Sequence, residues 1–249
     1  MTLPQYYTRL APFAETFLGG QPILTWHHVG RRPRGARLKG LYVSPGLFAR
    51  QLAELKRAGF HTPAFARATA GGVNPERNVF LTFDDGFRDV FEHALPILRE
   101  HGFRAMLFLV ADLIGKTNEW QQRAGDVVEP LMDEAQIREW LAAGHEIGSH
   151  TRTHPHLTRL PPEEAREEIV ASKKKLEDRF GVAVEHFCYP YGDWNPAVRD
   201  LVAAAGYRSA CTTEPGVNWD EGSALALRRF TARYPTRRLK AWWTRWRRR

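Results

Sequence analysis

Two short segments carry side chains that could together hold a metal ion and supply a general base. Asp84 and Asp85 follow one apolar run, and His150 and His154 follow another. Taken alone, the first segment is an ordinary Asp-Gly turn and the second an ordinary polar loop. Together they supply two imidazoles and a carboxylate, which can bind a divalent metal and leave positions open for substrate. The other carboxylate would then be free to act as a general base.

A third segment, Pro190-Tyr191-Gly192, follows another apolar run. Pro and Gly predict a rigid loop, and the backbone N–H of Tyr191 could face a developing oxyanion. Trp194, just beyond it, could line a ligand site, although packing explains it equally well. On its own this segment is also typical of an ordinary turn with an aromatic plug.

Apolar runs alternate with charged, helix-like segments that end in glycine, as at Gly59, Gly102, Gly144 and Gly206. Glycine just past a helix end adopts the left-handed conformation that stops the helix. This alternation predicts an α/β fold with a parallel sheet, whose ligands lie at the carboxyl ends of the strands. The predicted strands are Ile23–Val29, Asn78–Phe83, Ala105–Val110, Glu146–Ser149, His186–Tyr189 and Arg208–Thr212.

The 249 residues are 43% hydrophobic and 26% charged, which is typical of a globular protein and excludes a disordered chain or a coiled coil. We expect an N-terminal appendage (1–21), one barrel-like domain (22–234) and a basic tail (235–249). The first twenty residues do not resemble a secretory signal peptide, so we expect a cytoplasmic protein with two reduced cysteines.

The tail accounts for most of the net charge of +8, because its fifteen residues hold seven Arg and Lys and no acid. Leu239, Trp242, Trp243 and Trp246 recur at helical spacing, which predicts a surface helix or an extension outside the core. Trp and Arg suit the surface of an anionic membrane, and we expect a peripheral position at the inner membrane surface. Nucleic acid is the less favoured partner, and nonspecific electrostatic adhesion is the simplest alternative.

Three motifs, in order, are similar to those of the polysaccharide deacetylase family, carbohydrate esterase family four. They are Leu81–Gly86, Ser149–His154 and Tyr189–Gly192, within a resemblance that covers roughly residues 22–230. The opening segment looks like the subgroup that deacetylates poly-N-acetylglucosamine. The resemblance implies a distorted, incomplete (β/α) barrel of about seven parallel strands.

The resemblance also implies a role for each matching residue. Asp84 would be the general base, and the backbone of Tyr191 would stabilise the oxyanion. The implied metal is zinc, with cobalt, nickel or iron as alternatives. The implied metal ligands are Asp85, His150 and His154, and the substrate-binding residues are Pro190, Tyr191 and Trp194.

The sequence departs from the family pattern at two places. Cys188 stands where many members carry an Arg that braces the catalytic Asp, and we expect Arg228 or Arg229 to orient Asp84 instead. The late His that serves as general acid is missing, so either Asp84 returns its own proton or an earlier His replaces it, and His27 near the end of the first strand is the best candidate.

These observations predict a metal-dependent hydrolase that removes an N-acetyl or other N-acyl group from an amino sugar in a polysaccharide or glycoconjugate. The bond is a carbon–nitrogen bond other than a peptide bond. Alternatives are a deformylase or deacetylase of a lipid-linked sugar, an amidase acting on a small non-sugar amide, a catalytically weak carbohydrate-binding relative, and a protein that binds nucleic acid through its tail.

Overall fold

Seven parallel strands form a curled half-barrel in the computed structural model, which describes residues 4–123, 125–219 and 223–234. This confirms the predicted incomplete barrel. The parallel strands, in spatial order, are β10 (Phe230–Thr231), β1 (Gln21–Trp26), β4 (Phe80–Phe83), β5 (Met106–Leu109), β6 (Glu146–Ser149), β7 (His186–Cys188) and β8 (Ser209–Cys211). A short strand, β9 (Val217–Asn218), pairs antiparallel with residues 21 and 22 at the start of β1.

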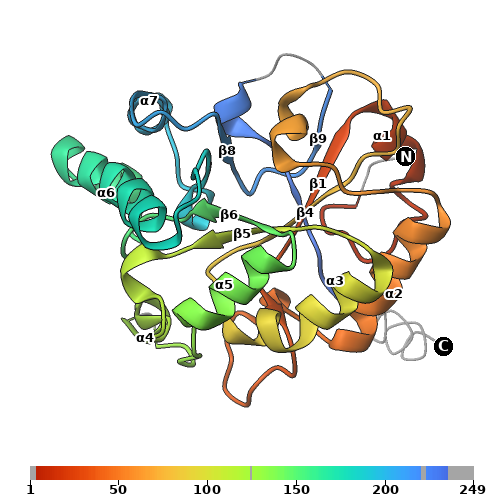
Figure 1. Ribbon diagram of the computed structural model, residues 1–249, viewed down its shortest axis with the longest axis horizontal. Helices are drawn as coiled ribbons and strands as arrows, with labels where there is room; N and C mark the ends of the chain where they lie inside the picture. Colours follow the sequence, from red (N-terminus) through yellow and green to blue (C-terminus); the bar gives the residue numbers. More distant parts are fainter. Residues whose placement is uncertain (1–3, 124, 220–222, 235–249) are drawn as a thin grey trace, which may run out of the picture.

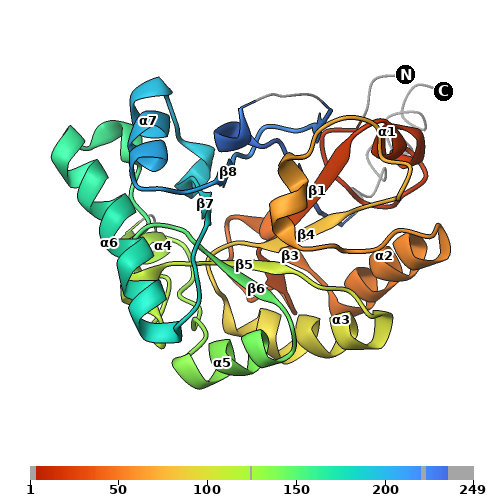
Figure 2. The ribbon, with the colours of Figure 1, turned by 45° about the horizontal axis from the view of Figure 1, so that its top comes forward.

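Helices line the outer face of this curved sheet (Figures 1 and 2). Several begin with side-chain caps: the Ser44 side chain accepts from the Leu47 N–H, and Asp133 and Gln136 form a capping box. The predicted helix-ending glycines all have positive φ. The helices are α1 (Ala14–Gly19), α2 (Pro45–Arg57), α3 (Leu95–His101), α4 (Glu119–Arg123), α5 (Glu134–Ala142), α6 (Pro162–Phe180) and α7 (Pro196–Ala204).

The first predicted strand, Ile23–Val29, is divided in the structure. β1 ends at Trp26, and β2 (His28–Val29) pairs instead with β3 (Tyr42–Val43), outside the main sheet. His27 therefore lies at the break between the two pairings, at the carboxyl end of β1.

The segment around β10 narrows the gap between the two edges of the half-barrel. Leu227 exchanges backbone hydrogen bonds with the β8 side, donating to the Ala210 carbonyl and accepting from the Thr212 N–H. Three residues later, Phe230 lies in parallel register with Leu24 of β1. Arg229 lies between these two contacts, and its side chain is buried within the barrel.

The N-terminal segment covers the barrel. Tyr7, Phe13 and Phe17 are fully buried, and the Tyr7 N–H donates to the Thr231 carbonyl at 2.9 Å. Phe13 also packs edge-on against Phe230, with ring centroids 4.9 Å apart. These contacts place the aromatic side chains of the N-terminal segment in the core of the barrel. Within the described ranges, no helix has both the length and the apolar character needed to cross a membrane.

Candidate active site

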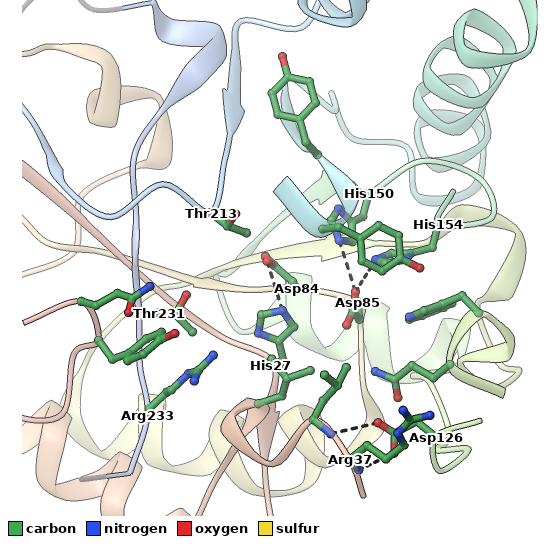
Figure 3. Close-up of a pocket in the computed structure, with 18 residues that line it drawn as sticks. His27, Arg37, Asp84, Asp85, Asp126, His150, His154, Thr213, Thr231 and Arg233 are labelled. Carbon is green, nitrogen blue, oxygen red and sulfur yellow. Dashed lines mark hydrogen bonds and ion pairs between the residues drawn. The ribbon is translucent and has the colours of Figure 1, made fainter. Parts of the chain in front are cut away.

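The carboxyl ends of β4 and β6 bring Asp85, His150 and His154 together. The Nε2 atoms of both histidines lie 3.3 Å from Oδ1 of Asp85, and all three side chains are buried. Figure 3 shows both imidazoles pointing at the same carboxylate oxygen. The predicted ligand residues are thus close enough for one ion to contact all three, although their role as ligands stays a prediction.

Backbone strain is concentrated around this cluster. Five non-glycine residues have positive φ among those the structure describes, and four lie at the site: Asp85, Thr151, His154 and Tyr191. Such conformations cost free energy and persist where surrounding contacts enforce them, commonly at functional sites. The loop after β6 has those contacts, since Glu168 of α6 accepts from the backbone N–H groups of residues 152 and 153.

Neighbouring groups fix the orientation of both imidazoles. Nδ1 of His150 lies 2.7 Å from the Cys188 carbonyl, so it donates there and leaves Nε2 to face Asp85. The His154 ring stacks on Trp120 at 4.4 Å, and the Tyr191 ring packs against it nearly perpendicularly at 4.5 Å. These contacts preorganise the two nitrogens toward a common point.

The donor set fits a divalent metal. Oδ1 of Asp85 is buried without a hydrogen-bond partner among the described residues, which is costly unless a cation contacts it. In a second group, Asp84, His150 and Cys188, the possible ligand atoms also lie within 4.8 Å of one another. It is the poorer candidate because burial raises the pKa of Cys188 to about 11, so the thiol keeps its proton. Metal binding needs the thiolate.

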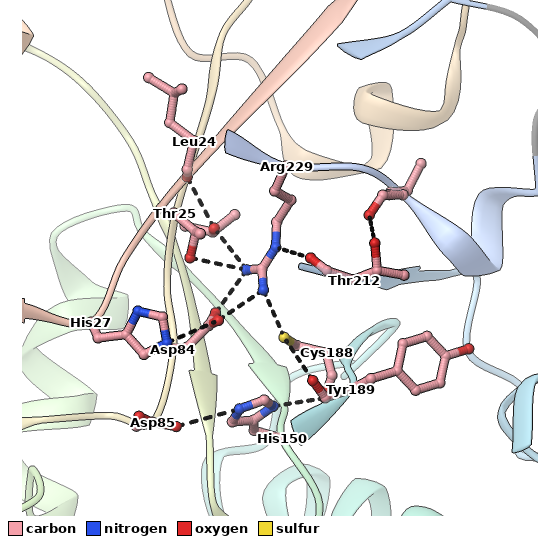
Figure 4. Close-up of polar contacts among 12 residues, drawn as sticks. Leu24, Thr25, His27, Asp84, Asp85, His150, Cys188, Tyr189, Thr212 and Arg229 are labelled. Carbon is pink, nitrogen blue, oxygen red and sulfur yellow. Dashed lines mark hydrogen bonds and ion pairs between the residues drawn. The ribbon is translucent and has the colours of Figure 1, made fainter. Parts of the chain in front are cut away.

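Asp84 has a different environment from its neighbour. Arg229 forms a bidentate pair with it, with Nη1 to Oδ1 and Nη2 to Oδ2 both at 2.8 Å (Figure 4). Burial would raise the pKa of Asp84, but the charge and hydrogen bonds of Arg229 outweigh it and lower this pKa below its ordinary value. The prediction that an arginine of the 228–229 pair orients Asp84 is confirmed.

The remaining N–H groups of Arg229 are also satisfied. Nε donates to the Thr212 carbonyl at 2.9 Å, Nη1 also reaches the hydroxyls of Thr25 and Thr82, and Nη2 lies 3.1 Å from Sγ of Cys188. The small Cys188 side chain therefore leaves room for a guanidinium that comes from the residue just before β10.

His27 lies on the opposite side of Asp84 from Arg229. Its Nε2 is 3.8 Å from Oδ2 of Asp84, and its Nδ1 is buried without a hydrogen-bond partner among the described residues. Burial lowers the pKa of His27, although the charges of Asp84 and Asp85 act in the opposite sense. The imidazole is therefore neutral at pH 7 and must receive a proton before it can donate one.

A cavity of about 560 Å³ opens over these residues. The side chain of Tyr191 is 47% exposed at its rim. Two of the predicted substrate-binding residues lie elsewhere: Pro190 is buried in the loop, and Trp194 lines a separate hollow, where its indole N–H faces Glu214 at 3.4 Å. The turn at Tyr191 (φ 60°) redirects the chain, so that Trp194 packs toward Tyr189.

Sequence reasoning missed several residues that line this cavity, Trp120 and Arg233 among them. Trp120 comes from α4 and stacks on His154, and Arg233 comes from the segment after β10. Neither lies in a motif next to the metal or base candidates. The only signal for Arg233 is its spacing. In an extended segment every second side chain lies on the same side, so residues 229, 231 and 233 share one side.

Comparison with known proteins agrees with this geometry. The family model described as polysaccharide deacetylase matches residues 71–210. A chitooligosaccharide deacetylase of Bradyrhizobium is 31% identical over 147 residues, covering 58% of this chain and 60% of that protein. The chain spans 51% to 62% of the length of the first three curated relatives it matches.

Solved structures share the fold over most of the chain. The Streptococcus pyogenes deacetylase PplD, in complex with acetate, superposes with a TM-score of 0.74 at 25% identity, covering 86% of this chain and 92% of that one. A polysaccharide deacetylase from Bacillus cereus also has a TM-score of 0.74, at 27% identity, covering 87% of this chain and 66% of that one.

Proposed function

Because the chain belongs to the polysaccharide deacetylase family, we propose that it is a metal-dependent hydrolase that removes an N-acetyl or other N-acyl group from an amino sugar. The observation that carries this proposal is the pairing of two adjacent carboxylates with separate partners. Asp85 faces two imidazole nitrogens, whereas Asp84 is held by a guanidinium beside the same cavity. One carboxylate is thus arranged for a cation and the other for proton transfer.

Asp85, His150 and His154 would hold the divalent metal, with zinc as the preferred ion and cobalt, nickel or iron as alternatives. When bound, the metal supplies Lewis-acid polarisation of the amide carbonyl and lowers the pKa of water to about 7. The three side chains contribute a rigid, buried donor set for it. Family four deacetylases use a divalent metal, which supports this assignment.

The chain's own residues divide the proton transfers. Asp84 accepts a proton from the attacking water, and Arg229 keeps its carboxylate ionised and correctly oriented. The backbone N–H of Tyr191 is the proposed donor to the oxyanion. His27 lies near enough to Asp84 to exchange a proton through a small movement, and would deliver it to the departing amine.

A lipid-linked amino sugar is the second candidate substrate, and the Trp- and Arg-rich tail favours it. We propose that the tail binds an anionic membrane surface while residues 22–234 carry the activity, with residues 1–21 as an appendage. A cytoplasmic location stays a prediction from the sequence. A catalytically weak relative is less well supported, because Arg229 and His27 occupy the environment of the two residues absent from the motifs.

The test measures acetate and formate released from a panel of glycans and lipid-linked sugars. The protein is first stripped of metal and then supplied with zinc, cobalt, nickel or iron. We expect release that depends on added metal, together with binding of one ion per chain. Metal binding without turnover of any N-acylated sugar would instead indicate a binding protein or an amidase with another substrate.

A further inference from the structure

A second hollow of about 650 Å³ opens beside the cavity that holds the candidate active site. The two hollows share part of their lining, so they form one continuous groove that leads away from Asp84 and Asp85. The shared residues are Gln5, Tyr6, Arg37, Leu38, Leu41 and Arg233. A substrate with its amide at Asp84 would extend its neighbouring substituent into this second hollow, called the side recess below.

Cations dominate the side recess. Arg37, Lys39 and Arg233 line it, and no carboxylate does so among the described residues. Neither Lys39 nor Arg233 forms an ion pair with a described residue. Asp126, on the wall of the main cavity, uses its carboxylate to accept from the backbone N–H groups of Arg37, Leu38 and Val127. The uncompensated charges are therefore those of Lys39 and Arg233, and concave surfaces with uncompensated positive charge attract anions.

Arg233 is positioned for such a ligand. Its guanidinium lies 3.7 Å from the centroid of the Tyr6 ring, and its Nε is buried without a hydrogen-bond partner among the described residues. It also packs on Gly40, where an added Cβ would lie only 2.6 Å from its Cζ. Stacking fixes the plane of the guanidinium and leaves its edge available for a bidentate contact to an oxyanion. In Figure 3 the group points into the cavity between Thr231 and His27.

We propose that the side recess binds an anionic group, a phosphate or a carboxylate, that the substrate carries next to its N-acylated sugar. Arg233 makes the main contact and Lys39 adds charge. The inference rests on the proposed function and narrows its substrate class from neutral amino-sugar polymers to amino sugars with an adjacent negative charge. No bond is made or broken in the recess; it orients the substrate and raises its affinity.

The experiment compares three substrates with the full-length, metal-loaded protein. They are N-acetylglucosamine 1-phosphate, a disaccharide of N-acetylglucosamine and glucuronic acid, and the neutral methyl glycoside of N-acetylglucosamine. We expect kcat/KM for at least one anionic substrate to exceed that for the neutral one by about tenfold or more, as a charge-assisted hydrogen-bond pair provides. The better of the two anionic substrates identifies phosphate or carboxylate as the source of the charge.

Two variants locate the effect. Arg233→Gln should lower the ratio of anionic to neutral kcat/KM about tenfold, and Gly40→Ala should lower it by displacing the guanidinium without removing its charge. Arg99→Gln on α3 removes an equal charge from a side chain that is 52% exposed and paired with Glu139, and should leave the ratio unchanged. An unchanged ratio in Arg233→Gln, or equal turnover of all three substrates by the wild type, overturns the proposal.

A binding measurement separates this proposal from the proposed function. Glucosamine 1-phosphate and glucosamine are titrated into the metal-loaded protein by calorimetry. Tighter binding of the phosphate that Arg233→Gln weakens supports the side recess even where no substrate is hydrolysed. Equal binding of the two compounds overturns it, even where the enzyme proves to be an active deacetylase.

Discussion

At the scale of single residues, two adjacent carboxylates are separated in role by their partners. Asp84 is paired with a guanidinium at 2.8 Å, and Asp85 faces two imidazole nitrogens at 3.3 Å. Desolvation would make two unpartnered neighbouring acids costly. The two sets of partners allow both to stay ionised and leave only Asp84 arranged for proton transfer.

The first prediction is that Asp84→Asn abolishes turnover but keeps the metal. Asn preserves the shape of the side chain but cannot accept a proton, and a general base contributes about 10²–10⁴-fold to the rate. The measurements are acetate release and metal content by mass spectrometry. Asp89→Asn is the matched control, because Asp89 pairs with His28 nearby and does not line the cavity. Loss of metal together with activity would show that Asp84 shares the ligand role.

The second prediction concerns Arg229, which orients the proposed general base Asp84. Arg229→Gln leaves Asp84 buried without its cation, and breaking one partner of a buried pair costs about 3–5 kcal/mol of unfolding free energy. In the wild type the lowered pKa of Asp84 contributes stability above its unfolded pKa, and this contribution is lost as the pH falls through its folded pKa. Without Arg229, burial raises that pKa, so the acidic limb of kcat/KM moves to higher pH.

Denaturant unfolding and pH–rate profiles measure these two effects. Arg228→Gln is the control, since the adjacent Arg228 is 53% exposed and faces Glu214 at 3.8 Å. An Arg229→Gln enzyme with the wild-type acidic limb would show that another group sets the ionisation of Asp84.

The part of the site that could be predicted from the sequence consists of the residues next to strand ends. Asp84 and His150 follow β4 and β6 directly and Asp85 is the next residue along, so a parallel sheet places them at one edge. Arg229 could be inferred because Cys188 stands where the usual Arg would be, so the negative charge of Asp84 needs another cation. Trp120 could not, and Arg233 is indicated only by its spacing from Arg229, because their positions depend on how α4 and the N-terminal segment pack over the cavity.

At the scale of elements, the apolar runs predict where the strands lie but make several of them too long. The run ending at Val29 continues past β1 because β2 is also buried, although it pairs outside the main sheet. That break sets His27 beside Asp84. Its partner, β3, has two residues, too few for any periodicity to mark it.

The third prediction concerns two histidines at the amino ends of neighbouring strands. Burial lowers the pKa of His145, just before β6, and of His186, which begins β7, to about 4. Between pH 6.5 and 4 the unfolded chain therefore binds more protons than the folded one. We expect the unfolding free energy to fall with acidification across this window, by up to about 1.4 kcal/mol per pH unit for each histidine.

Denaturant titrations from pH 7 to 4 measure this slope. His145→Gln and His186→Gln should each reduce this slope. His93→Gln should leave it unchanged, because His93 is exposed. A slope that is the same in all three variants would mean that other groups cause the acid sensitivity.

At the scale of the whole molecule, the final prediction concerns the basic tail, which lies outside the described residues. Its seven positive charges cannot all be buried, and its three Trp side chains favour an apolar partner surface. We expect truncation after Tyr234 to leave turnover of a soluble substrate near normal and to weaken binding to anionic liposomes. Each basic residue near such a surface contributes about 1 kcal/mol.

Co-sedimentation with anionic and neutral liposomes, at low and high salt, measures this binding. A full-length variant with Trp242, Trp243 and Trp246 changed to Ser keeps every charge, so it separates insertion of the aromatic rings from electrostatic adhesion. If its binding to anionic liposomes equals that of the wild type, the tail acts by charge alone. Equal binding by the truncated protein would rule out the membrane role. Tighter, salt-sensitive binding of the full-length protein to single-stranded nucleic acid would then identify the competing partner.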